Sequence, residues 1–160
     1  MAIEYYIDLD YPANPSDLAR WIASNMKMEY LKEEHNGEIV DRLIDDGIVC
    51  STGWKSQLGQ EIDKEEFDID SKIYAVCRIN KFDLYDVGME KYISVVILCL
   101  SELSCDLLLQ YHESSDAIIL RKNGKIYFAN NEGDHWNEYW KTHLDAACLE
   151  YTIKDLPSAP

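Results

Sequence analysis

The run Phe82–Leu103, FDLYDVGMEKYISVVILCLSEL, decides the fold class of this chain. We predict one helix over residues 83–103, with Asp83 as its N-cap and Asp86 adding negative charge to the first turn. Apolar side chains occupy nearly every face of this helix, which is typical of a helix buried on most sides. Its uncharged part, Tyr92–Ser101, is about half the roughly 20 residues that a membrane span needs. The run therefore predicts a core helix lying across a sheet.

The segments around this helix predict an antiparallel sheet. Ile3–Asp10 and Lys72–Asn80 alternate apolar and polar residues as half-buried strands do. Asn123 and Gly124 lie between two apolar arms, which indicates a tight hairpin. No βαβ-like repeat is visible. We therefore expect one α+β domain over residues 1–160, with a mainly antiparallel sheet and the long helix packed on it.

The remaining elements are predicted from shorter patterns. Asn14 and Pro15 suit the cap and first position of a helix. A last helix is expected over Asp134–Ala146, and Glu38–Asp46 allows either helical turns or a strand. Further short strands are expected at Met28–Glu33, Ile48–Ser51, Asp106–His112 and Leu149–Ile153. We expect a loop at Trp54–Gly59, and a loop running into a strand at Glu61–Asp70.

The charge of the chain is strongly negative. It has 30 acidic and 15 basic residues, for a formal net charge of −15. This balance argues against nucleic acid and against an anionic membrane surface as partners, because both attract Lys and Arg. It favours solubility and rapid encounter with a basic protein.

The densest acidic stretch is Glu61–Asp70, EIDKEEFDID, which is either a solvated face or a docking surface for a cationic protein. We take it as the candidate partner-binding site, together with Trp54, because a loop tryptophan can anchor an interface. The candidate residues are Trp54, Glu61, Asp63, Glu65, Glu66, Asp68 and Asp70.

Catalytic and metal-binding patterns are weak. His135 and His143 lie about two turns apart on a predicted helix, whereas zinc ligands on a helix usually lie three or four residues apart, and no HExxH occurs. No GxSxG motif, phosphate-binding glycine loop or dinucleotide fingerprint is present. We therefore expect no cofactor, no metal and no catalytic residue. The enzymatic alternative is a small hydrolase or transferase that uses His112, His135 or His143.

The chain has five cysteines, which is an odd number, and no two of them form a CxxC motif. Cys77 and Cys99 lie in apolar runs, as reduced core thiols do. Because no export signal follows Met1, we expect a cytoplasmic protein without a structural disulfide.

Several stretches together carry a family resemblance. They are IEYYIDLD at 3–10, INKFDLYDVGME at 79–90, DLLLQY at 106–111, AIILRKNGKIYFAN at 117–130, the tryptophan pair before the last helix, and TIKDLP at 152–157. Their order resembles the immunity proteins encoded beside bacterial polymorphic toxins, especially those that protect against swarm-inhibition toxins delivered by outer-membrane exchange. Immunity proteins of contact-dependent growth inhibition systems are a close variant. Residues 27–70 match poorly, as expected where an immunity protein meets its own toxin.

The resemblance implies a small cytoplasmic protein that binds one toxin domain and blocks it, without catalytic residues of its own. Many such toxins are nucleases, which are basic because their substrate is polyanionic. An acidic inhibitor is steered toward such a surface. Besides the enzyme, the remaining alternative is an acidic adaptor for another basic protein.

Overall fold

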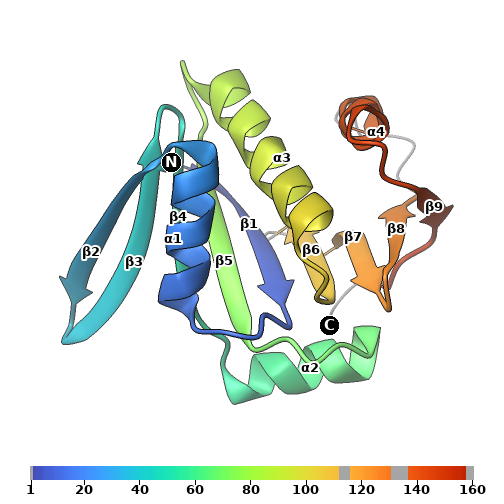
Figure 1. The fold of residues 1–160 in the computed structure, drawn as a ribbon, viewed down its shortest axis with the longest axis horizontal. Helices are drawn as coiled ribbons and strands as arrows, with labels where there is room; N and C mark the ends of the chain where they lie inside the picture. Colours follow the sequence, from blue (N-terminus) through green and yellow to red (C-terminus); the bar gives the residue numbers. More distant parts are fainter. Residues whose placement is uncertain (1, 112–115, 131–136, 158–160) are drawn as a thin grey trace.

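The computed structural model describes residues 2–111, 116–130 and 137–157. Within them, one sheet has the strand order β2-β3-β4-β5-β1-β6-β7-β8-β9 (Figure 1). The elements are β1 (Ala2–Leu9), α1 (Pro15–Met26), β2 (Glu29–His35), β3 (Glu38–Asp45), β4 (Ile48–Trp54), α2 (Gln57–Phe67), β5 (Ile73–Asn80), α3 (Tyr85–Glu102), β6 (Leu107–Tyr111), β7 (Ala117–Lys122), β8 (Lys125–Ala129), α4 (Asn137–Ala146) and β9 (Tyr151–Lys154). Neighbouring strands are antiparallel except β8 and β9, which are parallel. The expected α+β class with a mainly antiparallel sheet is confirmed.

The long helix α3 packs on the sheet over β5 and β4, as its apolar faces predicted. Its start differs from the prediction. The helix begins at Tyr85 behind Leu84, and no side chain caps it. The Tyr85 N–H donates to the carbonyl oxygen of Phe82, which forms a tight turn ahead of the helix. Asp83 lies inside this turn and is therefore not the N-cap, whereas Asp86 does lie in the first helical turn.

Three helices and the central strand share one core. In α1 the Asn14 side chain accepts from the Asp17 N–H at 2.9 Å and Pro15 is the first residue, as predicted.

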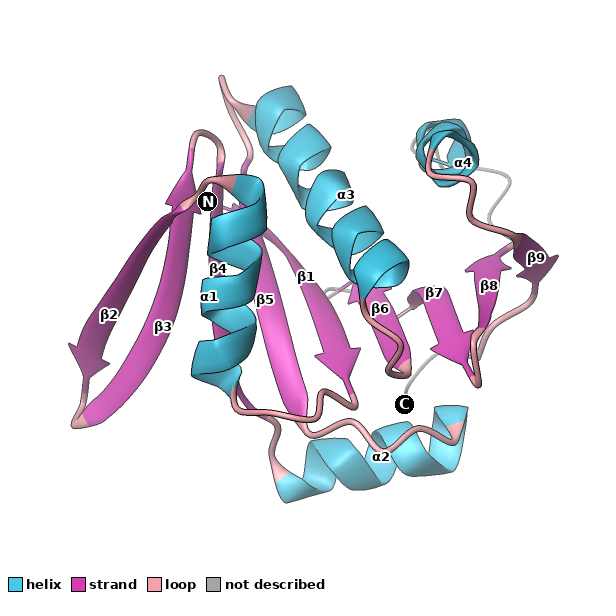
Figure 2. Cartoon of the chain, in the orientation of Figure 1, coloured by secondary structure: helices cyan, strands magenta, loops and turns pink. Residues whose placement is uncertain are grey.

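An aromatic column links three elements of the core. The ring of Tyr92 in α3 stacks on Tyr5 of β1 at 4.4 Å and meets Trp140 of α4 edge-on at 5.6 Å. This column joins α4 and α3 to the middle of the sheet. Figure 2 distinguishes the helices from the strands of the sheet by colour.

The C-terminal end of α3 is held by a buried arginine. Arg121 of β7 is 4% exposed and donates to the carbonyl oxygens of Leu100 at 2.7 Å and Cys105 at 2.8 Å. A third, longer contact of 3.4 Å reaches the oxygen of Cys99. A cation beside carbonyls at the C-terminal end of a helix also opposes the negative end of the helix dipole. Arg121 thus fastens α3 to β7.

The hairpin prediction is confirmed, because Asn123 and Gly124 both have positive φ between β7 and β8. The ambiguous segment Glu38–Asp46 is a strand, β3, since its residues Asp41–Asp45 pair with β4. The expectation for residues 54–70 is wrong. Trp54 ends β4, and most of the acidic stretch is the helix α2 rather than a loop running into a strand. Ser56 starts this helix by accepting from the Gly59 N–H at 3.1 Å.

The two faces of the sheet differ. In β5, Ile73, Ala75 and Cys77 are buried on the face that carries α1 and α3. Tyr74 and Val76 alternate with them on the other face and are partly exposed. On that other face, Phe67 and Ile69 form a second apolar cluster with Leu108, Ala117 and Leu120. The C-terminal end of α2 therefore covers β6 and β7, while no described helix covers the surface over β3, β4 and β5 on this face.

Candidate functional site

The candidate site is the outward face of α2. Glu61 and Glu65 are exposed and lie one helical turn apart, and Leu58 on the same side is 67% exposed. Glu66 is also exposed, on the flank of the helix. Among the described residues, no cation pairs with Glu61, Glu65 or Glu66; Glu61 only accepts from the Gln57 amide at 3.3 Å. We call Leu58, Glu61, Glu65 and Glu66 the α2 outer face.

The inward side of α2 is tied to the sheet by a buried ion cluster. Lys55 lies 2.5 Å from Asp8 Oδ2 on β1 and 2.9 Å from Asp63 Oδ2 on α2. The Ser71 hydroxyl also donates to Asp63 at 2.5 Å. Asp8 and Asp63 are 1% and 2% exposed, so both carboxylates depend on this one cation. The cluster joins the α2 segment to the central strand.

Burial governs the protonation of this cluster. Desolvation raises the pKa of Asp8 to about 7, with Lys55 opposing the rise and Asp63 adding to it. The Asp8 Oδ1 atom has no hydrogen-bond partner in the described part of the chain, so one side of the carboxylate is desolvated without compensation. Burial alone would lower the pKa of Lys55, but the two carboxylates outweigh it and the pKa is raised. Lys55 therefore stays charged while Asp8 titrates near neutral pH.

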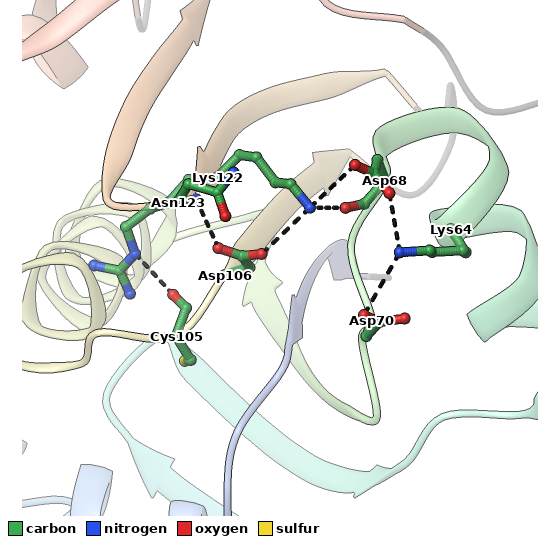
Figure 3. A network of polar contacts seen from close by, with 8 residues as sticks. Lys64, Asp68, Asp70, Cys105, Asp106, Lys122 and Asn123 are labelled. Carbon is green, nitrogen blue, oxygen red and sulfur yellow. Dashed lines mark hydrogen bonds and ion pairs between the residues drawn. The ribbon is translucent and has the colours of Figure 1, made fainter.

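A second set of ion pairs holds the C-terminal end of α2 (Figure 3). Lys122, beside the hairpin turn, contacts both the carbonyl oxygen and the carboxylate of Asp68, and it reaches Asp106 at 3.6 Å. Lys64 pairs with Asp68 at 2.9 Å and with Asp70 at 3.6 Å. The Lys64 and Lys122 side chains hold the pKa of Asp68 below its usual value. These lysines join the end of α2 to the β7–β8 hairpin.

The structure thus separates the six predicted carboxylates into three groups. Asp63 is buried in the ion cluster and does not face solvent, because its helical position turns it toward β1. Asp68 and Asp70 are exposed but are paired with lysines of this chain. Glu61, Glu65 and Glu66 remain on the α2 outer face. The sequence shows all six carboxylates alike, since the lysines that distinguish them follow no pattern of their own.

Trp54 is the last residue of β4 and precedes α2 in the chain. It is not part of the α2 outer face. Its side chain is 63% exposed, and that of Ile39 on β3 is 70% exposed. Both residues line a hollow beside Asn14 and Pro15, at the N-terminal end of α1. The exposure of Ile39 was not predicted, because the pattern of Glu38–Asp46 fits either helical turns or a strand. The structure therefore adds an exposed apolar pair next to the predicted anchor.

Of the three histidines in the enzymatic alternative, the structure describes His143. His143 points back at its own helix, where Nδ1 lies 3.0 Å from the Tyr139 carbonyl oxygen. His112 and His135 fall outside the described residues. Burial raises the pKa of the Cys99 thiol to about 12, so it is a poor nucleophile at neutral pH. Cys50 and Cys77 are buried, and their Sγ atoms lie 2.9 Å apart as free thiols.

In residues 2–111, 116–130 and 137–157, no group of three His, Cys, Asp or Glu side chains is arranged to hold a metal ion. No helix in the same residues has the length and hydropathy to cross a membrane.

Comparison with protein families assigns the chain to a class of immunity proteins that belong to toxin systems. The particular family is the SitI3-like family, whose model matches residues 3–140, and the chain belongs to this family. The match covers β1 to β8 and extends into α4, in agreement with the family resemblance predicted from the sequence. Neither the curated proteins nor the solved structures that were compared contain a match.

Proposed function

We propose that this protein binds a basic toxin domain in the cytoplasm and neutralises it by binding rather than by catalysis, with the α2 outer face as the docking surface. The observation that carries the proposal is the position of Glu61, Glu65 and Glu66. They project from one helix, while the lysines around that helix are paired with other carboxylates. The net charge of −15 surrounds this surface with a field that attracts cations.

The chemistry suits a toxin that acts on nucleic acid. Such a toxin presents Lys and Arg to bind phosphates. Carboxylates can form short, charge-assisted hydrogen bonds with the same side chains and so compete for them. Opposite charges on the two partners also raise the association rate, particularly at low salt. A basic nuclease domain is therefore the toxin class that this surface matches best.

The anchoring of α2 supports the same role. Lys55 fixes the N-terminal half of the segment to β1, and Lys122 fixes its end to the β7–β8 hairpin. A surface that is already ordered loses little conformational freedom on binding, which leaves more of the interaction free energy as affinity. Leu58 supplies exposed apolar area beside the carboxylates, and Trp54 supplies more in the hollow at the start of α1, as interface anchors do.

The test is binding kinetics against the toxin domain encoded beside this gene, at two salt concentrations, with growth protection measured in parallel. Reversing Glu65 and Glu66 to Lys should slow association at least tenfold at low salt, and the difference should shrink at high salt. The melting temperature should change little, because both side chains are exposed.

The matched control reverses Glu102 and Glu150 to Lys. Both are exposed, and they lie at the end of α3 and between α4 and β9, so the net charge changes equally without touching α2. If both double variants slow association alike, only overall charge matters and the α2 outer face is not the docking surface. If the α2 variant binds at the wild-type rate and still protects cells, the proposed surface is wrong, and residues 29–38 are the next to test.

A further inference from the structure

Among the described residues, no helix covers the face of the sheet opposite α1 and α3 over three strands. Alternation places Arg42 and Ile44 of β3, Val49 and Ser51 of β4, and Tyr74, Val76 and Arg78 of β5 on this face. All of them are at least partly exposed, whereas their strand neighbours Leu43, Cys50 and Ala75 are buried under the helices. We call these seven residues the open sheet face.

The charge of the open sheet face is unlike that of the rest of the protein. It carries two arginines and no carboxylate. Arg42 pairs with Glu33 of β2 at 3.1 Å, and Arg78 pairs with Glu4 of β1. Both glutamates lie on the strands that flank the open sheet face. The charges there are balanced locally, although the chain as a whole has a net charge of −15.

We propose that the open sheet face is the interface between two copies of this chain. Two molecules with a charge of −15 repel each other wherever their acidic surfaces meet. A two-fold axis brings the same patch of both copies together, so the patch must be complementary to itself. The open sheet face meets this condition, since its arginines can face the flanking glutamates of the second copy while Val49 and Val76 pack in the centre.

The same charges argue against a basic toxin at this face. A basic partner is drawn to the α2 outer face and finds no excess negative charge on the open sheet face, where Arg42 and Arg78 balance the flanking glutamates. A self-associated protein would keep its α2 outer faces free, because α2 covers β6 and β7 rather than β3, β4 and β5.

The small size of the face indicates a weak interface. Three strands of seven or eight residues cover roughly 25 by 15 Å at ordinary strand rise and spacing. This is less than the roughly 800 Å² per partner of a standard interface. We therefore expect a weak dimer, with a dissociation constant in the micromolar range.

The experiment is sedimentation equilibrium of the isolated protein from about 1 to about 200 µM, a range chosen around that expected affinity. The wild type should pass from monomer to dimer across this range. Val76→Glu should raise the dissociation constant at least tenfold. Val87→Glu is the matched control, since Val87 is 39% exposed at the start of α3, away from the open sheet face, and should leave the dimer unchanged. Ser51→Arg is a second test variant that adds positive charge at the centre of the face without removing an apolar side chain.

A wild type that stays monomeric at all concentrations would overturn the proposal, as would two test variants that fold and dimerise like the wild type. Toxin binding is measured on the same proteins. Val76→Glu should still bind the toxin, whereas reversal of Glu65 and Glu66 should leave the dimer intact. The dimer and the toxin surface can therefore fail independently. Loss of toxin binding by Val76→Glu, with a monomeric wild type, would assign the open sheet face to the toxin and refute the dimer.

Discussion

Gly47 and Gly88 bring the turn between β3 and β4 into backbone contact with the first turns of α3. A Cβ atom on Gly47 would lie 2.6 Å from the Leu84 carbonyl oxygen and 2.8 Å from the Gly88 nitrogen. A Cβ on Gly88 would meet the Gly47 carbonyl group, which also accepts from the Asn80 N–H at 3.0 Å. This contact sets the distance between α3 and the sheet at its N-terminal end.

Gly88→Ala should therefore destabilise the protein, although alanine is the better helix former. The new methyl group meets backbone that cannot move aside, and overpacking of this kind costs roughly 1–3 kcal/mol. Urea unfolding measures the loss. Gly59→Ala in α2 is the control, because its Cβ would meet side-chain atoms of Lys55 and Ser56 at 3.0 Å or more rather than backbone. A Gly88→Ala protein as stable as that control would refute the tight contact.

Arg121→Met should destabilise the protein by roughly 3 kcal/mol, because it leaves buried carbonyl groups at the end of α3 without a donor. Arg121→Lys should fall between the wild type and Arg121→Met, since one ammonium group cannot reach all three oxygens in the geometry of the guanidinium fork. Thermal and urea unfolding provide the ranking. Equal stability of the Met and Lys variants would show that charge and hydrogen bonding at this position contribute nothing.

The buried Asp8 should make stability depend on pH. Its pKa is about 7 in the folded protein, against an ordinary value of 3.8 for an aspartate in the unfolded chain. Between these values the folded protein holds a proton that the unfolded chain has released. The unfolded state then binds fewer protons, so the contribution of Asp8 to the free energy of unfolding falls as pH rises from about 4 to about 7.

Asp8→Asn removes this titration and should flatten that part of the profile. The measurement is urea unfolding of both proteins at intervals between about pH 5 and about pH 7.5, which spans the window in which the two states differ in bound protons. The difference between the two curves isolates Asp8 from the other carboxylates. A difference that stays constant across this range would contradict the raised pKa.

Asp63 and Glu65, two residues apart in α2, should separate stability from binding. Asp63→Asn weakens the buried cluster with Lys55 and Ser71, so we expect a loss of roughly 1–3 kcal/mol in the free energy of unfolding. The association rate with the toxin should be unchanged at temperatures below the melting temperature. Glu65→Gln should leave the melting temperature unchanged and slow association with the toxin at low salt. Calorimetry and stopped-flow binding on both proteins test the pair, and the opposite pattern would reverse their assigned roles.

Trp54→Ala should speed dissociation of the toxin complex roughly tenfold or more if Trp54 is an anchor of the interface. Its exposure of 63% predicts that stability changes little. Ile39→Ala, in the same hollow, is the companion variant. Dissociation rates of both variants are measured by surface plasmon resonance and compared with the wild type. A wild-type rate for Trp54→Ala would exclude this tryptophan from the interface.

The parts of the fold that depend on local sequence were open to prediction. Asn14 and Pro15 start α1, Asn123 and Gly124 turn the hairpin, and the apolar faces of α3 require burial, all within a few neighbouring residues. The start of α3 was predicted wrongly because the turn at Phe82 precedes the helix. An aspartate next to a helix is not its cap unless the backbone there is in position.

The helix α2 could not be predicted because the residues that hold it are distant in sequence or polar. Lys55 pairs with Asp8, which is 47 residues earlier, and Lys122 pairs with Asp68, 54 residues before it. The inward-facing Asp63 interrupts the apolar stripe by which an amphipathic helix is usually predicted, and Gly59 lowers the helix propensity of the segment. The acidic stretch was therefore predicted as a loop running into a strand, and the difference between Asp63 and Glu65 became visible only in three dimensions.

The place of β1 in the sheet has a consequence for the timing of folding. This strand is synthesised first, yet it lies between β5 and β6, and β6 ends only at Tyr111. The centre of the sheet cannot close on a ribosome until that residue has emerged, and contacts across such long loops form slowly. If the protein binds a toxin as proposed, protection depends on molecules that were translated and folded before the toxin arrives.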